Sequence, residues 1–256
     1  MRALATLVVV LLLGLAPVPA GAESLVTSLS NSRVLIGSNY TGTSIALFGA
    51  IERDSQTVSR ATPYDVVVTV RGPRQYIVVR EKESLGPLWL NREQQKFPGA
   101  PSYLSVLTSR PVADITSDQL RMRQKVGLQS IIHAVDFTND RSGADRPFRD
   151  ALFRLKSKEG LYLEEERGVA FLTPTIFRAS IPLPATAPPG DYDVEVTLLA
   201  DTVILSRTVT HFEMVKTGFE QQVGLAARDW AWVYGAMTAI IALFCGWTAS
   251  VIFRRD

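Results

Sequence analysis

The chain has 256 residues, with 27 basic and 25 acidic side chains and a net charge of +2. This length allows one domain, or two small ones, in addition to targeting segments. The even charge balance argues against a nucleic-acid-binding protein, which would concentrate basic side chains on one face. The single cysteine, Cys245, rules out a disulfide within the chain, so the core alone must hold the fold.

Residues 1–22 are predicted to be a secretory signal peptide. Arg2 precedes an apolar run from Leu4 to Leu15, and Ala20-Gly21-Ala22 fits a cleavage site. The mature chain would then begin near Glu23. An uncleaved N-terminal anchor is the alternative, but an apolar run of about 12 residues is short for a membrane span.

Residues 23–110 are predicted to form a β-rich part. The strongest strand is Tyr64 to Val70, which is rich in β-branched side chains. Gly72-Pro73 predicts a turn, after which residues 75–80 would return as the second strand of a hairpin. Trp89 lies in a short apolar patch and is expected to pack in the core or on a sheet.

Residues 111–166 are predicted to be a helical insertion. Thr116-Ser117-Asp118 offers a helix cap before residues 119–125. Residues 128–137 are apolar at i, i+3, i+4 and i+7, as in an amphipathic helix. A third helix should begin after Pro147 and end at Gly160. The acidic residues 164–166 are expected in a solvated loop or at a helix end.

Residues 167–215 are predicted to return to strands that close the fold. After the Pro188-Pro189-Gly190 turn, residues 191–198 alternate, which places Tyr192 and Val194 on an inward face together with Val196 and Leu198. A tyrosine after such a turn, followed by a final hairpin, is typical of immunoglobulin-like sandwiches. The fold class is therefore mainly β, an immunoglobulin-like β-sandwich or sandwiches with a helical insertion and one C-terminal transmembrane helix.

Residues 230–253 are predicted to be that transmembrane helix. They carry no charge and would span about 36 Å as a helix, which exceeds a hydrocarbon core of about 30 Å. Residues 216–229 would be a juxtamembrane linker, either a plain spacer or an amphipathic continuation of the helix. The tail, residues 254–256, should be cytoplasmic under the positive-inside rule. The expected interface residues are Trp230, Trp232, Tyr234, Arg254 and Arg255.

Small side chains recur along one face of the predicted membrane helix. Such a face lets helices approach closely, so the helix could associate with itself or with a polytopic membrane protein. Small residues are also common in membrane helices that do not associate. The residues of this face are Gly235, Ala239, Ala242, Gly246 and Ser250.

The sequence offers little for catalysis. His133 and His211 are the two histidines, and a nucleophilic site would need one of them beside its nucleophile. His211 and Glu213 share a strand face, but two ligands are too few for a metal site. We therefore expect no catalytic, metal or cofactor site and no cofactor.

The order of short motifs along the chain resembles the alphaproteobacterial "putative transmembrane protein" family, whose biochemical activity is unassigned. The resemblance implies an exported β-rich domain with a C-terminal membrane helix. It also implies that members are encoded near membrane permeases of the sulfite-exporter type, which suggests an accessory role in transport. The motifs are Arg33-Val34-Leu35-Ile36, Tyr40-Thr41-Gly42-Thr43, Leu47-Phe48-Gly49-Ala50, Phe148-Arg149-Asp150-Ala151-Leu152, Leu161-Tyr162, Phe177-Arg178-Ala179, Leu183-Pro184-Ala185 and Pro189-Gly190-Asp191-Tyr192.

The expected function is that of a non-enzymatic accessory or interaction subunit of a membrane complex. The protein would sit in the bacterial inner membrane with its β domain in the periplasm, and its partners would be the lipid bilayer and a polytopic permease or a second copy. The alternative is a tethered ligand- or solute-binding module with a groove between sandwich and insertion, near Trp89 or Tyr162. A hydrolase of unfamiliar type is a third hypothesis, weakened by the scarcity of histidine.

Overall fold

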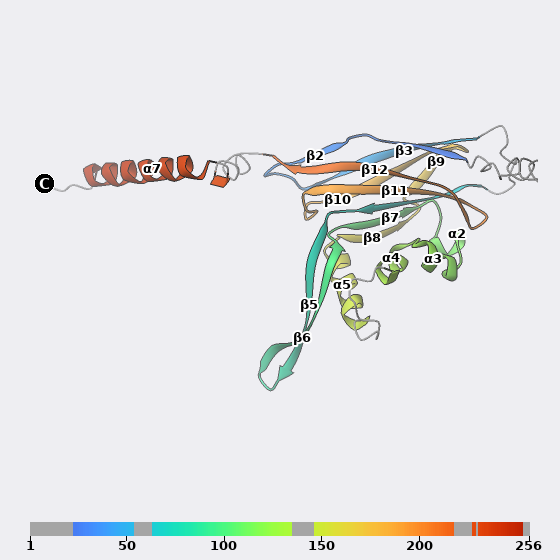
Figure 1. The fold of residues 1–256 in the computed structure, drawn as a ribbon, viewed down its shortest axis with the longest axis horizontal. Coiled ribbons are helices and arrows are strands. Elements are labelled where there is room, and N and C mark those ends of the chain that lie inside the picture. Colours follow the sequence, from blue (N-terminus) through green and yellow to red (C-terminus); the bar gives the residue numbers. More distant parts are fainter. Residues whose placement is uncertain (1–22, 54–62, 135–145, 218–226, 229, 253–256) are drawn as a thin grey trace, which may run out of the picture.

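A computed structural model describes residues 23–53, 63–134, 146–217, 227–228 and 230–252. Two facing sheets form its β domain (Figure 1). The first has the order β1-β3-β10-β9, with bounds Ser24–Leu29, Gly42–Glu52, Ile176–Pro184 and Val169–Thr173. The second has the order β2-β12-β11-β4-β7-β8, with bounds Arg33–Ile36, Val203–Lys216, Gly190–Ala200, Asp65–Arg71, Leu104–Thr108 and Tyr162–Glu166.

Both sheets combine strands from the two ends of the chain, so the two β-rich parts form one sandwich. In the first sheet β3 pairs with β10, and in the second β4 pairs with β11. The core lies between the sheets, where apolar side chains from alternate positions of the strands meet. Tyr192, Val194, Val196 and Leu198 are all buried there, as their alternation predicted.

The connectivity is that of an immunoglobulin-like sandwich, which confirms the predicted fold class. β1 pairs antiparallel with β3 in one sheet, while β2 crosses over and pairs parallel with β12 in the other. The hydroxyl of Tyr192 donates a hydrogen bond of 2.6 Å to the carbonyl oxygen of Pro188. This is the tyrosine-corner geometry of immunoglobulin-like domains.

The predicted hairpin at Gly72-Pro73 is wrong. The chain bends there but continues into β5 (Arg74–Leu85), turns at Gly86-Pro87, and returns through β6 (Leu88–Pro101). Pairing continues across the bend, because Gly72 N donates to the Tyr103 oxygen and Ser102 N to the Pro73 oxygen, both at 2.9 Å. The pair β5–β6 therefore forms an arm that projects from the sandwich (Figure 1).

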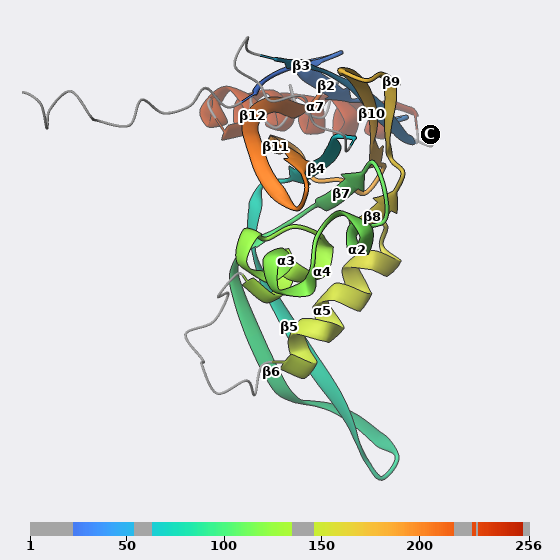
Figure 2. The same cartoon turned by 90° about the vertical axis from the view of Figure 1, so that its right-hand side faces the viewer.

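In the described residues between β7 and β8, four helices form the helical insertion, beside the arm (Figure 2). They are α2 (Val112–Ile115), α3 (Asp118–Gln124), α4 (Leu128–Ala134) and α5 (Arg146–Lys158). The insertion ends earlier than predicted, because residues 162–166 form β8, a strand at the edge of the second sheet that pairs parallel with β7. The acidic side chains at 164–166 suit such an edge, since an edge strand keeps one side open to water.

The arm has a small core of its own. Phe97 and Ala100 of β6 and Val79 of β5 pack against Leu152 of α5, apart from the main core. Helix α5 thus supports the base of the arm, while residues 81–91 extend past it. Trp89 lies in this outer part and is 69% exposed, so its predicted place in a core or sheet packing is wrong.

The C-terminal helix α7 runs from Ala231 to Ile252. Among the described residues it is the one helix long and apolar enough to cross a membrane, and none of its apolar window is buried. Its length of about 33 Å matches a hydrocarbon core of about 30 Å. The predicted signal peptide, most of the linker, and Arg254 and Arg255 lie outside the described residues.

Candidate functional site

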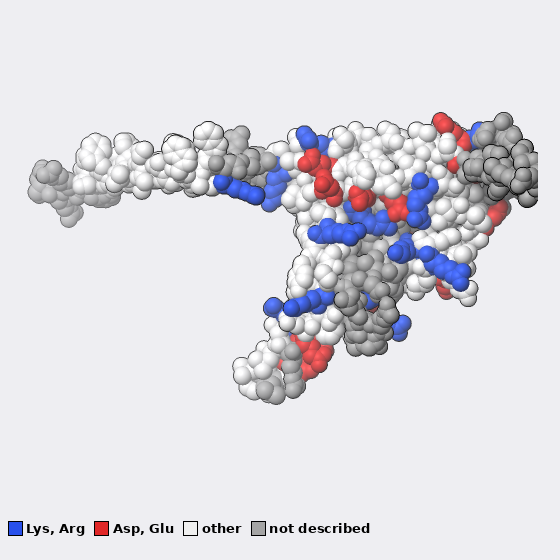
Figure 3. Space-filling model, in the orientation of Figure 1, with Lys and Arg blue, Asp and Glu red and all other residues white. Residues whose placement is uncertain are grey.

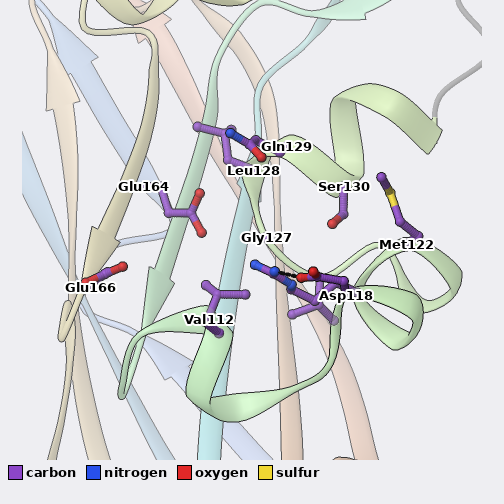
Figure 4. Close-up of a pocket in the computed structure, with 12 residues that line it drawn as sticks. Val112, Asp118, Met122, Gly127, Leu128, Gln129, Ser130, Glu164 and Glu166 are labelled. Atoms are coloured by element: carbon purple, nitrogen blue, oxygen red, sulfur yellow. Dashed lines mark ion pairs between the residues drawn. The ribbon is translucent and has the colours of Figure 1, made fainter.

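A groove of about 490 Å³ lies between the helical insertion and β8 (Figure 4). The predicted position between sandwich and insertion is therefore correct, but neither Trp89 nor Tyr162 lines the groove. Trp89 is on the arm, and Tyr162 is buried, with its hydroxyl donating to the carbonyl oxygen of Pro101 at 2.7 Å. The polar lining side chains are Asp118, Arg121, Gln129, Ser130, Glu164 and Glu166.

Glu164 is the carboxylate most affected by its surroundings. Burial raises its pKa, and repulsion from Glu166 adds to this effect. A hydrogen bond from the backbone of Leu128 and the nearby charge of Arg121 act in the opposite direction. Gly127, the residue before Leu128, has a φ of +87°, a conformation that favours glycine. A Cβ built there would lie 3.2 Å from Val112 Cγ1 and 3.5 Å from Glu164 Oε1.

The charges of the groove are partly paired. Arg121 and Asp118 form an ion pair along one turn of α3 (Figure 4). The lining contains three carboxylates and this one guanidinium, so its formal charge is negative. Such a groove favours a cationic or zwitterionic solute over an anion.

The two histidines lie on separate elements of the fold. His211 Nδ1 lies 2.7 Å from Asp193 Oδ1 on the neighbouring strand, and both side chains are exposed. Glu213 pairs instead with Arg33 at 3.1 Å, and His133 lies in α4. Among the described residues, no three His, Cys, Asp or Glu side chains gather as a metal site would require.

Several motifs that carried the family resemblance meet in space, and their roles are structural. The Tyr40 hydroxyl donates to the Leu183 carbonyl oxygen at 3.1 Å, and Gly42, with a φ of +111°, lies against the same oxygen. Gly49 of β3 faces the ring of Phe177, its partner in β10. These contacts hold the first sheet together and create no reactive group.

The small-residue face of α7 is open. No atom of the described residues lies within 4 Å of a Cβ built at Gly235 or at Gly246. The hydroxyls of Thr238 and Thr248 donate to carbonyl oxygens of their own helix, each at 2.9 Å. In the hydrocarbon core of a membrane there is no water, so polar groups must form their hydrogen bonds within the protein. Trp230 and Trp232 are exposed at the beginning of the helix.

The chain matches none of the curated proteins with which it was compared. Among solved structures it is similar to the Escherichia coli protein AggA, the major subunit of aggregative adherence fimbriae type I. That similarity has 9% identity and a TM-score of 0.27 over 77% of this chain and 97% of the other, too low to add to what the topology shows.

A family comparison agrees with the apolar helix and the β-rich domain. Residues 24–255 match the family described as "Putative transmembrane protein (Alph_Pro_TM)". The match extends from β1 to the residues just beyond α7, and thus includes the whole sandwich, the arm and the insertion. The chain therefore belongs to this family of transmembrane proteins.

Proposed function

We propose that the protein is a non-enzymatic accessory subunit of a complex in the bacterial inner membrane, anchored by α7 with its β domain in the periplasm. The observation that carries this proposal is that α7 is uncharged, has no buried residue, and has no described atom within 4 Å of a Cβ built at Gly235 or Gly246. A polytopic transport protein is the partner class that fits, because small side chains let its helices approach the backbone of α7.

Photocrosslinking from α7 in native membranes tests this proposal. A photoreactive residue at Leu243 lies at the edge of the small-residue face, about 60° from Gly246, while one at Phe244 points about 160° away. We expect Leu243 to give an adduct with a polytopic membrane protein and Phe244 to give none. The additional change Gly246→Leu should abolish the Leu243 adduct.

Two results would contradict the accessory role. Equal labelling from Leu243 and Phe244 would mean that α7 has no preferred face. A single adduct that contains only a second copy of this chain would replace the accessory role with self-association.

The second candidate function is a tethered solute-binding module, favoured by the groove between β8 and the insertion. The test is thermal unfolding of the full chain in detergent with a set of cationic, zwitterionic and anionic solutes. We expect cationic or zwitterionic solutes to raise Tm, and we expect Glu166→Gln to remove that increase. A solute that stabilises the variant equally must bind elsewhere.

A further inference from the structure

The outer end of the arm is an uncharged, exposed tip. From Ser84 to Asn91 the sequence carries no charge. In this stretch Leu88, Trp89 and Leu90 are 62%, 69% and 47% exposed. On the face shown in Figure 3, acidic side chains gather beside the tip, and the described residues of the tip itself carry none. Exposed apolar side chains that lie together, such as this tryptophan and these leucines, are typical of a surface that contacts another protein or a membrane.

Apolar side chains occupy both faces of this ribbon. Successive side chains of a strand point to opposite faces, so Trp89 lies on one face and its neighbours Leu88 and Leu90 lie on the other. The partners across the ribbon are Ser84 for Trp89 and Glu83 for Leu90. A flat protein surface would cover one face and leave the other in water, whereas a lipid phase covers both.

The arm begins at the end of the sandwich from which the chain leads to α7. A Cβ at Gly190 would lie 3.0 Å from Pro73, at the base of the arm. Gly190 in turn pairs with Met214, two positions before β12 ends at Lys216. The arm and the path to the membrane helix therefore start side by side.

The lengths of the arm and the tether also agree. β5 has 12 residues, and at about 3.3 Å per residue the arm reaches about 40 Å. Residues 217–229, which join β12 to α7, span at most about 45 Å when fully extended. The two lengths are therefore compatible with contact between the tip of the arm and the bilayer.

We propose that the tip of the arm inserts into the headgroup–acyl boundary of the membrane that α7 spans, on the side of the β domain. Trp89 suits that boundary, because its ring is apolar and its N–H can stay near the headgroups. The uncharged part of the ribbon reaches about 10 Å along the strands, which matches the depth of interfacial segments. Glu83 and Lys82 would remain in the headgroup layer. This proposal goes beyond the accessory role and does not depend on it.

Site-directed fluorescence on the full chain in lipid nanodiscs tests the proposal, without any other protein present. In a Cys245→Ser background, Leu88→Cys carries an environment-sensitive label at the tip. The matched control is Val203→Cys, because Val203 is also exposed, at 55%, but lies beside the β11–β12 turn at the far end of the sandwich. We expect the label at 88 to emit at shorter wavelength than the control and to be quenched by nitroxide lipids. The label at 203 should behave as in water.

A substitution of the neighbouring side chain, Trp89, provides a second test of the proposal. Trp89→Asp in the Leu88→Cys chain should return emission and quenching to the level of the control, while near-UV circular dichroism verifies the fold. A label at 88 that stays in water overturns the proposal. A label that shifts to shorter wavelength but escapes lipid quenching also overturns it, because it shows contact with a second copy of the chain.

Discussion

Tyr192 joins two structural roles in one side chain. Its ring stacks on Phe212 of the neighbouring strand with centroids 4.9 Å apart, and its hydroxyl donates to Pro188 four residues earlier. The first contact belongs to the core, and the second fixes the turn that leads into β11. The two roles can be separated by experiment, because phenylalanine keeps the ring and removes the hydroxyl.

We predict that Tyr192→Phe lowers the free energy of unfolding by about 1–2 kcal/mol, since it leaves the Pro188 carbonyl without its donor. Thermal unfolding of the full chain in detergent measures the change. Tyr76→Phe is the control, because Tyr76 is 61% exposed and the loss there should stay within about 0.5 kcal/mol. Equal losses in both variants would mean that the turn does not depend on this hydrogen bond.

Gly49 provides a prediction about packing in the first sheet. A Cβ at this position would lie 2.0 Å from Cζ of Phe177, so the ring covers the glycine and leaves no room for a methyl group. Gly49→Ala should lower stability by about 1–3 kcal/mol, as overpacking does. The double variant Gly49→Ala with Phe177→Leu should lose less than the sum of the two single variants. Simple additivity would contradict this contact.

Three buried phenols predict how stability depends on alkaline pH. Burial raises the pKa of Tyr103, Tyr162 and Tyr192. In the unfolded chain a phenol titrates near pH 10. Their contribution to stability is therefore complete below that pH and decreases as pH rises above it, because the unfolded state loses protons that the folded state keeps.

Denaturant unfolding at a series of pH values, followed by tyrosinate absorbance, measures this decrease. Tyr162→Phe removes one of the three phenols and should give a shallower slope above pH 10 than the unchanged chain. If the two slopes are the same, Tyr162 titrates alike in the folded and unfolded states.

The separate core of the arm predicts local unfolding. Leu152 of α5 is buried against Phe97 and Val79 of the arm, and Leu152→Ala should cost about 2–5 kcal/mol at that site. Because this cluster is apart from the main core, hydrogen exchange should accelerate in α5 and in the base of the arm, while β4 and β11 keep their protection. Acceleration throughout the sandwich would show that the two cores unfold together.

The sequence predicted those elements whose signals are local. Residues 191–198 of β11 alternate in sequence, α5 follows a helical period after Pro147, and α7 carries no charge, so each could be recognised without its neighbours. The tyrosine corner was also predictable, because the turn and the tyrosine are adjacent in the chain. These signals were enough for the fold class.

The arm could not be predicted from the sequence, because the conformation of Gly72-Pro73 depends on residues that lie far away in the chain. Gly72-Pro73 has the composition of a turn, but hydrogen bonds to residues 102 and 103 hold it as a bend inside one long ribbon. A Cβ at Gly72 would lie 2.9 Å from Tyr103 Cβ, so close packing explains the glycine. Trp89 was misplaced for the same reason, since its exposure follows from the length of the arm.

The candidate groove was predictable only in outline. A helical insertion beside a sandwich suggests a groove between the two, and the structure has one. Its lining includes residues of β8. That strand was not predicted, because a run of acidic residues such as Glu164 to Glu166 is typical of a solvated loop. The position of Gly127 beside Glu164 arises from the tertiary packing of α4 against β8.

The parallel pairing of β2 with β12 determines how the domain bears mechanical load from its anchor. β12 leads toward α7, and its last residues pair with Arg33–Ile36 on one side, with Thr217 N donating to the Ile36 oxygen at 2.9 Å. On its other side β12 pairs with β11 along nearly its whole length. A pull on α7 therefore acts along the strands and stretches many backbone hydrogen bonds together. The force from the membrane anchor therefore loads the strand pairs in shear, and it is shared among many backbone hydrogen bonds.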